Sequence, residues 1–176
     1  MKSRKRLLVV DGYNVLHAAS TLRQTGSSFE DARYAFANRL ENYAGFTGQK
    51  IILVFDAWLS ERYGRSIESR GALTVVFTRK GETADHYIER LCDEYAQDVE
   101  YGRLELRVAT SDNVEQTVVF GRGAIRISAR EFLYEMEQAE RECAKYVTPE
   151  KKHKHTLFDS LSEETRKKLE EMRRGQ

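Results

Sequence analysis

The sequence has few of the residues that hold small secreted or metal-bound folds together. It contains one proline, Pro149, and two cysteines, Cys92 and Cys143, in 176 residues. The cysteines lie far apart and form no Cys-x-x-Cys pair, which argues against a disulfide framework or a thiolate zinc site. We expect two reduced thiols in the core, and any bound metal must therefore have oxygen ligands.

Long hydrophobic runs and an excess of one charge are also absent. Only four apolar residues separate the basic start of the chain from Asp11, too few for a signal peptide or a membrane span. We therefore expect a cytoplasmic protein with no membrane partner. The 29 Lys and Arg residues nearly balance 28 Asp and Glu, for a formal net charge of +1. Any affinity for nucleic acid must come from how these charges are distributed.

The length and composition indicate one folded domain followed by a charged tail. A chain with 40% hydrophobic and 32% charged residues is typical of a soluble globular protein. The composition changes at Pro149, where a lysine-rich stretch begins. We expect a main domain over residues 1–146 and a charged linker with a helical extension over 147–176. A surface helix docked on the domain is the favoured role for this tail, and an RNA or ribosome contact is the alternative.

Short apolar runs alternate with stretches of helical period, which predicts an α/β fold. Buried strands are expected at residues 7–10, 51–55, 73–77, 104–108 and 124–127. Helices are expected from Ser27 to Gly48, over 84–97, through Val114 and Val118, and after Ser128. Capping signals precede three of them, at Ser27 with Glu30, at Thr83, and at Ser128 with Glu131. The prediction is a three-layer fold with a mostly parallel sheet of about five strands, and a polar loop over 57–72.

Four aspartates lie at or near the carboxyl ends of these strands. Asp11 and Asp56 directly follow apolar runs, Asp112 follows the fourth strand, and Asp85 lies in the first turn of a helix. The carboxyl ends of parallel strands meet at one edge, where the functional crevice of such sheets lies. Carboxylates gathered there raise their own pKa values, a cost that a divalent cation removes. Oxygen ligands suit Mg²⁺ or Mn²⁺, which keep waters that can act as nucleophiles, and phosphodiester hydrolysis is the reaction that fits.

Each aspartate also has a purely structural explanation. Asp11 and Asp56 could be turn residues, since Asp is common where a strand ends. Asp85 could be favoured by the helix dipole, and Asp112 could cap the helix that follows it. The recurrence of one acid at the same end of successive strands favours a shared site over four independent turns.

Four strings of the sequence together resemble the YacP-like branch of the NYN domains, within the PIN-like nuclease superfamily. They are LVVDGYN at 8–14, VFDAW at 54–58, KGETADHYIE at 80–89 and ATSD at 109–112. The resemblance runs from about Leu7 to Cys143. It implies a metal-dependent endoribonuclease and, from a ribosome-associated member of the family, cleavage of messenger RNA in the ribosomal A site. It maps the acidic residues of the family onto Asp11, Asp56, Asp85 and Asp112, and an asparagine onto Asn14.

These observations assign expected roles. Asp11, Asp85 and Asp112 are expected to hold one or two Mg²⁺ or Mn²⁺ ions as catalytic residues, with Asp56 as a further ligand or as a support for one. Asn14 is expected to orient the scissile phosphate or a carboxylate. Glu82 is either a reserve acid or a residue that only complements the helix start. The expected RNA contacts are Tyr13, Asn14, Arg65, Arg79 and Lys80, with Trp58, Arg62, Tyr63 and Arg70 in the same loop as Arg65. For Tyr13, packing is an equally weighted alternative, and for Trp58, packing on the core is the favoured one.

Other functions fit less well. A haloacid dehalogenase-type phosphatase needs a second Asp two residues after the first, where this chain has Tyr13. A dinucleotide-binding oxidoreductase needs Gly-x-Gly-x-x-Gly after a strand, whereas Gly121 and Gly123 follow an expected helix and lack the third glycine. We therefore expect no nucleotide cofactor. The serious alternative is a non-catalytic RNA- or ribosome-binding adaptor in which the acids are structural.

Overall fold

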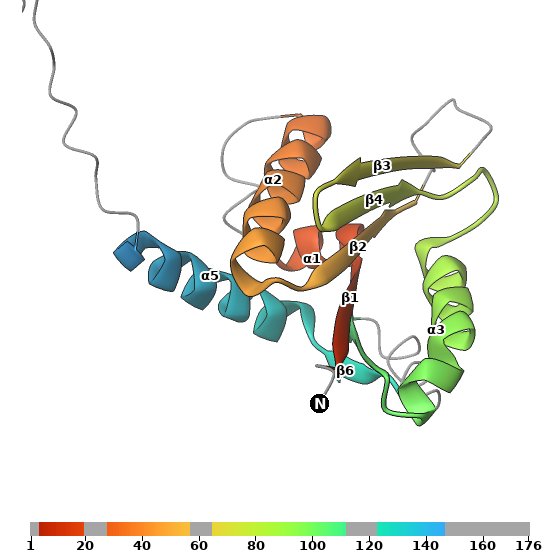
Figure 1. The fold of residues 1–176 in the computed structure, drawn as a ribbon. Helices are drawn as coiled ribbons and strands as arrows, with labels where there is room; N and C mark the ends of the chain where they lie inside the picture. Colours follow the sequence, from red (N-terminus) through yellow and green to blue (C-terminus); the bar gives the residue numbers. More distant parts are fainter. Residues whose placement is uncertain (1–3, 20–27, 57–64, 112–122, 147–176) are drawn as a thin grey trace, which may run out of the picture. The chain divides into compact units, whose positions relative to one another are not determined.

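A six-stranded sheet with the order β3-β4-β2-β1-β5-β6 forms the middle layer of the fold (Figure 1). The computed structural model describes residues 4–19, 28–56, 65–111 and 123–146. The strands are β1 (Lys5–Asp11), β2 (Lys50–Phe55), β3 (Ser66–Arg70), β4 (Leu73–Phe77), β5 (Leu104–Ala109) and β6 (Ile125–Ile127). Among these strands β3 pairs antiparallel with β4, and the other pairings are parallel. The predicted α/β class with a mostly parallel sheet is confirmed.

Helices cover both faces of this sheet (Figure 1). The helices are α1 (Gly12–Ala18), α2 (Phe29–Thr47), α3 (Ala84–Glu100) and α5 (Ala129–Tyr146). Neighbouring residues of a strand point to opposite faces, so Leu8 and Val10 of β1 enter the core under α1, α2 and α5. Leu7 and Val9 enter the core under α3. Burial on both faces explains why β1 reads as a continuous apolar run.

The register of the parallel strands places their carboxyl ends side by side. Asp11, the last residue of β1, is paired with Val54 of β2, and Val10 is paired with Ala109 of β5. Phe55 at the end of β2 is paired with Phe77 at the end of β4. The residues that follow these strands therefore meet at one edge of the sheet.

Two of the predicted helix caps are present as expected. The side chain of Thr83 accepts the backbone N–H of His86 at 3.2 Å and caps α3. The side chain of Glu131 accepts the N–H of Ser128 at 2.9 Å, and Ser128 Oγ accepts the N–H of Glu131 at 3.2 Å. These reciprocal bonds at the start of α5 form the expected capping box.

The capping box of α2 lies one residue later than predicted. Ser28 and Asp31 form it, with the N–H of Ser28 bonded to the Asp31 carboxylate at 3.0 Å. Ser27 and Glu30 have the same spacing as Ser28 and Asp31, so the sequence pattern fits a capping box at either pair equally well. At the other end, Gly48 caps the helix with a φ of 64°, a left-handed conformation that glycine adopts without strain.

Residues 66–70 form the edge strand β3, where the sequence predicts a polar loop. The strand pairs along its whole length with β4, from Ser66 opposite Phe77 to Arg70 opposite Leu73. No residue of β3 is fully buried. A strand held at the sheet edge by backbone hydrogen bonds needs no alternation of apolar residues, and charged side chains there discourage pairing with another chain. The hydrophobic pattern therefore gives no sign of this strand.

Part of the predicted organisation stays untested. The chain divides into a compact unit over Met1–Ala144 and a second unit over Lys145–Gln176. Only Lys145 and Tyr146 of the second unit lie among the described residues, so the extension over 147–176 remains a prediction. The helix expected through Val114 and Val118 also lies outside the described residues. None of the described helices has the length and apolar character required to cross a membrane.

Candidate active site

Asp11 is a buried carboxylate at the junction of β1 and α1. It is 6% exposed, and it caps α1 by accepting the backbone N–H of Asn14 at 2.9 Å. Desolvation raises the pKa of Asp11 to about 6, against the lowering effect of the Asn14 hydrogen bond. The negative charges of Asp85 and Asp56 contribute to this rise. A cap alone does not require this burial, and such a perturbed acid at a strand end is characteristic of functional sites.

Asp56 joins the end of β2 to the start of α3. Its carboxylate accepts the backbone N–H of Ala84, the residue before Asp85. Burial raises the pKa of Asp56, and the hydrogen bond from Ala84 partly offsets this. The structure therefore brings Asp11, Asp56 and Asp85 together at one edge of the sheet, from three separate parts of the chain.

Asn14 connects α1 to the end of β5. Its side-chain oxygen accepts the backbone N–H of Ser111 at 2.9 Å, across 97 residues of sequence. Ser111 is the residue before Asp112, and Asp112 itself lies outside the described residues. Asn14 thus fixes the backbone leading to the fourth predicted acid. A contact of Asn14 with a phosphate stays a prediction.

The carboxylates at this edge are a chemically suitable donor set for a hard divalent cation. Across residues 4–19, 28–56, 65–111 and 123–146, no three His, Cys, Asp or Glu side chains form a group that could hold a metal ion. Mg²⁺, however, is usually bound by one or two carboxylates and keeps several waters. A cation beside Asp11 would also relieve the repulsion from Asp85 and Asp56. Metal binding by Asp11, Asp56, Asp85 and Asp112 stays a prediction that this chemistry fits.

Glu82 is bound by arginines and is not free to serve as a reserve acid. Its side chain is 9% exposed and lies 2.8 Å from Arg65, 2.7 Å from Arg90 and 3.6 Å from Arg79. Burial alone would raise the pKa of Glu82, but the hydrogen bonds from Arg65 and Arg90 outweigh it and lower the pKa to about 2. Glu82 is therefore charged at neutral pH and holds the guanidinium groups in place.

The ring of Tyr87 supports two of these arginines. The guanidinium carbon of Arg65 lies 4.8 Å from the ring centroid, and that of Arg90 lies 5.0 Å from it. Arg90 is not among the contacts expected from the sequence, because an arginine on the exposed side of a helix looks like any other surface charge. Only its convergence with Arg65 on Glu82 distinguishes it.

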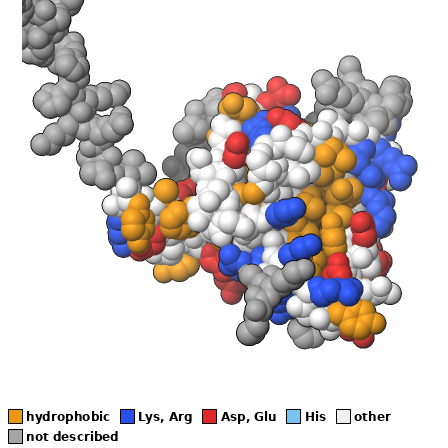
Figure 2. Space-filling model, viewed as in Figure 1, with side chains coloured by type: hydrophobic (Ala, Val, Ile, Leu, Met, Phe, Trp, Pro, Cys, Tyr) orange, Lys and Arg blue, Asp and Glu red, His pale blue; other side chains and the backbone are white. Residues whose placement is uncertain are grey.

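A basic patch lies near the acids and consists of Arg65, Arg79, Arg90 and the exposed Lys80. Figure 2 shows Lys and Arg side chains gathered over the connection between β4 and α3. Three guanidinium groups share the single carboxylate of Glu82, so this cluster carries a net positive charge. Arg65, Arg79 and Lys80 were expected RNA contacts, and their placement in one patch suits a phosphate backbone. The other candidate residues of the loop, Trp58, Arg62 and Tyr63, lie outside the described residues.

Tyr13 belongs to a cluster of aromatic rings beside Asp11. Its ring centroid lies 5.0 Å from that of Phe55 and 5.4 Å from that of Phe29. Its hydroxyl accepts a hydrogen bond from Arg33 at 3.3 Å. These contacts match the packing alternative for Tyr13, and its contact with RNA stays a prediction.

We expect Glu82→Gln to lower the free energy of unfolding by about 1–2 kcal/mol at pH 7, because three guanidinium groups lose their shared counter-charge. The folded-state pKa of Glu82 is depressed, so its stabilisation is present above the unfolded pKa and is lost as the pH falls towards about 2. The difference between wild type and variant should therefore shrink below about pH 4.5, the ordinary pKa of this acid. Urea unfolding at several pH values measures this.

The matched control is Glu140→Gln. Glu140 also accepts two hydrogen bonds from an arginine, Arg39, at 2.8 and 3.0 Å, but its side chain is 43% exposed. We expect this change to cost about 0.5 kcal/mol or less, because solvent screens the pair. Equal losses in the two variants would contradict a special role for Glu82.

Comparisons with known proteins agree with the fold. The family model of the YacP-like NYN domain matches residues 8–174. The curated protein YacP of Bacillus subtilis is 39% identical over 170 residues, which cover 96% of this chain and 97% of that protein. The crystal structure of Rae1 (YacP) from Bacillus subtilis is similar with a TM-score of 0.67 and 39% identity, covering 96% of this chain and 95% of that chain. The crystal structure of a mutant of Rae1 is similar with a TM-score of 0.65 and 34% identity, covering 95% of this chain and 99% of that chain.

Proposed function

The chain belongs to the YacP-like NYN domain family, and from that membership and the geometry of its acids we propose that it is a divalent-metal-dependent endoribonuclease. The observation that carries this proposal is the meeting of Asp11, Asp56 and Asp85 at the carboxyl edge of the sheet. The raised pKa of Asp11 supports it, because the protein keeps a buried, electrostatically unfavourable group there. A site for a cation explains that arrangement.

In the proposed site Asp11, Asp85 and Asp112 hold the metal, and Asp56 ligates it or fixes the start of α3. A bound Mg²⁺ or Mn²⁺ supplies an activated water and neutralises charge that develops on the phosphate. Asn14 holds the backbone at Ser111, so that the end of β5 stays beside α1. The basic patch holds the RNA backbone by charge, and Glu82 keeps its arginines in place.

The proposed substrate is messenger RNA on the ribosome, cleaved in the A site, in the cytoplasm. The nuclease-like fold and the basic patch support RNA as the substrate, and the family resemblance supports the ribosome. The alternative is a non-catalytic RNA- or ribosome-binding adaptor. The cap that Asp11 gives to α1 and the bond from Ala84 to Asp56 are the structural roles that this alternative would require.

A cleavage assay with purified full-length protein tests the nuclease. We expect new RNA ends with Mg²⁺ or Mn²⁺, and none with a chelator. Asp85→Asn should lower the rate by about a hundredfold or more, because it removes a charged metal ligand. The control is Asp93→Asn, an exposed acid on the same helix, which should cleave like wild type. Normal cleavage by Asp85→Asn would mean that the site is wrong.

Translating ribosomes test the finer proposal. Mapping RNA ends with wild type and with Asp85→Asn should give ends in the A-site codon with wild type alone. Ends that arise equally on free RNA would remove the ribosome from the proposal and leave the nuclease. Salt-sensitive ribosome binding without new ends would support the adaptor instead.

A further inference from the structure

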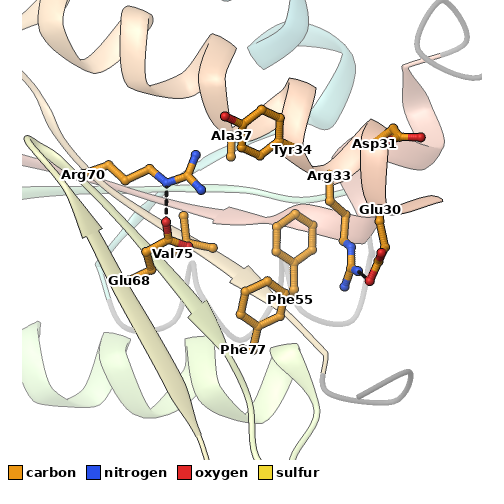
Figure 3. Close-up of a pocket in the computed structure, with 10 residues that line it drawn as sticks. All are labelled: Glu30, Asp31, Arg33, Tyr34, Ala37, Phe55, Glu68, Arg70, Val75 and Phe77. Atoms are coloured by element: carbon orange, nitrogen blue, oxygen red, sulfur yellow. Dashed lines mark hydrogen bonds and ion pairs between the residues drawn. The ribbon is translucent and has the colours of Figure 1, made fainter. Parts of the chain in front are cut away.

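A pocket of about 300 Å³ lies between α2 and the strands β2, β3 and β4 (Figure 3). Arg33 and Tyr34 of α2 form one wall, and Phe55 and Phe77 form the other. The pocket lies on the α2 face of the sheet, at the end of β2, where Phe55 directly precedes Asp56. The ring of Tyr13, two residues after Asp11, also contacts Phe55 at 5.0 Å between centroids. A ligand in this pocket would lie at the carboxyl ends of β2 and β4, the same edge of the sheet at which the acids lie.

The walls of the pocket are flat groups that suit a planar ligand. The rings of Phe55 and Phe77 stack at 5.5 Å with an angle of 21° between their planes. The guanidinium of Arg33 lies 5.6 Å from the centroid of Phe77, and that of Arg70 lies 5.4 Å from the centroid of Tyr34. Tyr34 is 62% exposed, so its ring is accessible to a ligand. Aromatic rings and arginine planes are the surfaces on which proteins stack unpaired bases.

The charges around the pocket favour a neutral ligand over a phosphate. Its lining includes Glu30, Asp31 and Glu68 with Arg33 and Arg70, and the carboxylate of Asp31 is bonded to Ser28 at the start of α2. Arg33 pairs with Glu30 at 3.3 Å and Arg70 pairs with Glu68 at 2.8 Å. In Figure 3 these pairs lie at opposite ends of the pocket. A phosphate would meet guanidinium groups whose charge is already balanced by a carboxylate, whereas a nucleobase, with both donors and acceptors on its edges, would meet both kinds of partner.

We propose that this pocket binds an unpaired nucleobase of the RNA substrate, stacked against the exposed ring of Tyr34. This inference rests on the proposed function and adds to it a site for one base. The basic patch lies at the start of α3, which covers the other face of the sheet. The protein thus holds the backbone with the basic patch and reads one base with the pocket, which gives cleavage a preference at one nucleotide position.

Binding to RNA oligonucleotides that lack one base tests the pocket. A series of short single-stranded RNAs, each with one abasic nucleotide at a different position, is titrated with full-length protein in chelator. Wild type should lose roughly tenfold in affinity when the base at one position is absent. Tyr34→Ala should bind intact RNA roughly tenfold more weakly than wild type does. Removal of the base at that position should then cause no further loss of its affinity. Tyr34→Phe, which keeps the ring, should behave like wild type.

The matched control is Tyr101→Ala. Tyr101 is 68% exposed and lies under an arginine, Arg103, at 4.9 Å, as Tyr34 lies under Arg70. It ends α3 just before β5, at the opposite edge of the sheet from the acids. This variant should bind the whole series like wild type. Two results would contradict base binding in the pocket. One is a wild-type affinity that does not depend on which base is absent, and the other is the same dependence in wild type and Tyr34→Ala.

The same RNAs with Mg²⁺ separate this proposal from the nuclease. If cleavage does not depend on which base is absent, the nuclease proposal stands and the proposal of base binding in the pocket is wrong. Base-dependent binding without cleavage, lost in Tyr34→Ala, would leave the pocket and remove the nuclease. Thermal unfolding of Tyr34→Ala should match wild type within a few degrees, since the side chain is exposed.

Discussion

Asp11→Asn is expected to reduce RNA cleavage by about a hundredfold or more while the protein stays folded. Asparagine caps a helix as well as aspartate does, so α1 should keep its first turn. What the variant loses is the negative charge that Asp11 contributes beside Asp85 and Asp56. Initial rates on a defined RNA with saturating Mg²⁺ measure the effect, and circular dichroism checks the fold. Cleavage at the wild-type rate would show that Asp11 does not act in the reaction.

The same variant is expected to be more stable than wild type at neutral pH. Burial raises the pKa of Asp11 from 3.8 to about 6, so between these values the folded protein binds a proton more tightly than the unfolded chain. The free energy of unfolding therefore falls as the pH rises through this range, by up to about 3 kcal/mol for a shift of this size. The asparagine of the variant carries no charge and escapes this loss.

Urea unfolding in chelator, from about pH 4 to about pH 8, measures this difference. The advantage of Asp11→Asn should grow between about pH 4 and 6 and then stay constant, following the pKa of the buried acid. Asp93→Asn, which changes an exposed acid, should show no such growth. A constant difference over the whole range would contradict the burial of a charge at Asp11. Greater stability together with lost activity would identify Asp11 as a residue kept for function.

Gly12→Ala is expected to destabilise the protein by about 1–3 kcal/mol through overpacking. A Cβ on Gly12 would overlap three atoms of the Phe55 ring. That ring is 1% exposed and stacks on Phe77, while Tyr13 contacts it at 5.0 Å, so it has little room to move. Because Gly12 lies between Asp11 and Tyr13, the displacement should also lower the cleavage rate.

Gly45→Ala is the matched control for this change. Gly45 lies inside α2, and a Cβ there would meet no atom within 4 Å. Alanine in a helix interior is favoured over glycine by about 0.5–1 kcal/mol, so this variant should gain stability. Thermal and urea unfolding of both variants measure the contrast. If the Gly12→Ala protein were as stable as the Gly45→Ala protein, the ring of Phe55 would have to move aside without cost, which would contradict the prediction.

The sequence predicted the elements whose signals are local. Continuous apolar runs such as 7–10 indicated strands buried on both faces, and Thr83 and Ser128 marked helix starts that the structure confirms. The convergence of Asp11 and Asp56 followed from parallel topology, because strand ends share an edge, and that of Asp85 followed from its place in the first turn of the helix after β4. Their roles in catalysis remain predictions.

The features that the sequence did not reveal depend on partners distant in the chain. The strand over 66–70 is held by β4 and buries almost nothing, so no apolar pattern marks it. Glu82 looked like a spare acid because its arginines come from the start of β3, from α3 and from the connection between β4 and α3. The pocket near Tyr34 and Phe77 likewise arises only when α2 packs on the strands.

The carboxylate of Glu82 has a consequence for how tightly RNA can be held. A free arginine side chain samples many rotamers, and fixing it on a ligand costs up to about 2 kcal/mol of conformational entropy. Hydrogen bonds to Glu82 and the ring of Tyr87 restrict Arg65 and Arg90 before any ligand arrives. A phosphate that binds there meets preorganised donors, so most of that ordering is completed during folding rather than at the moment of association.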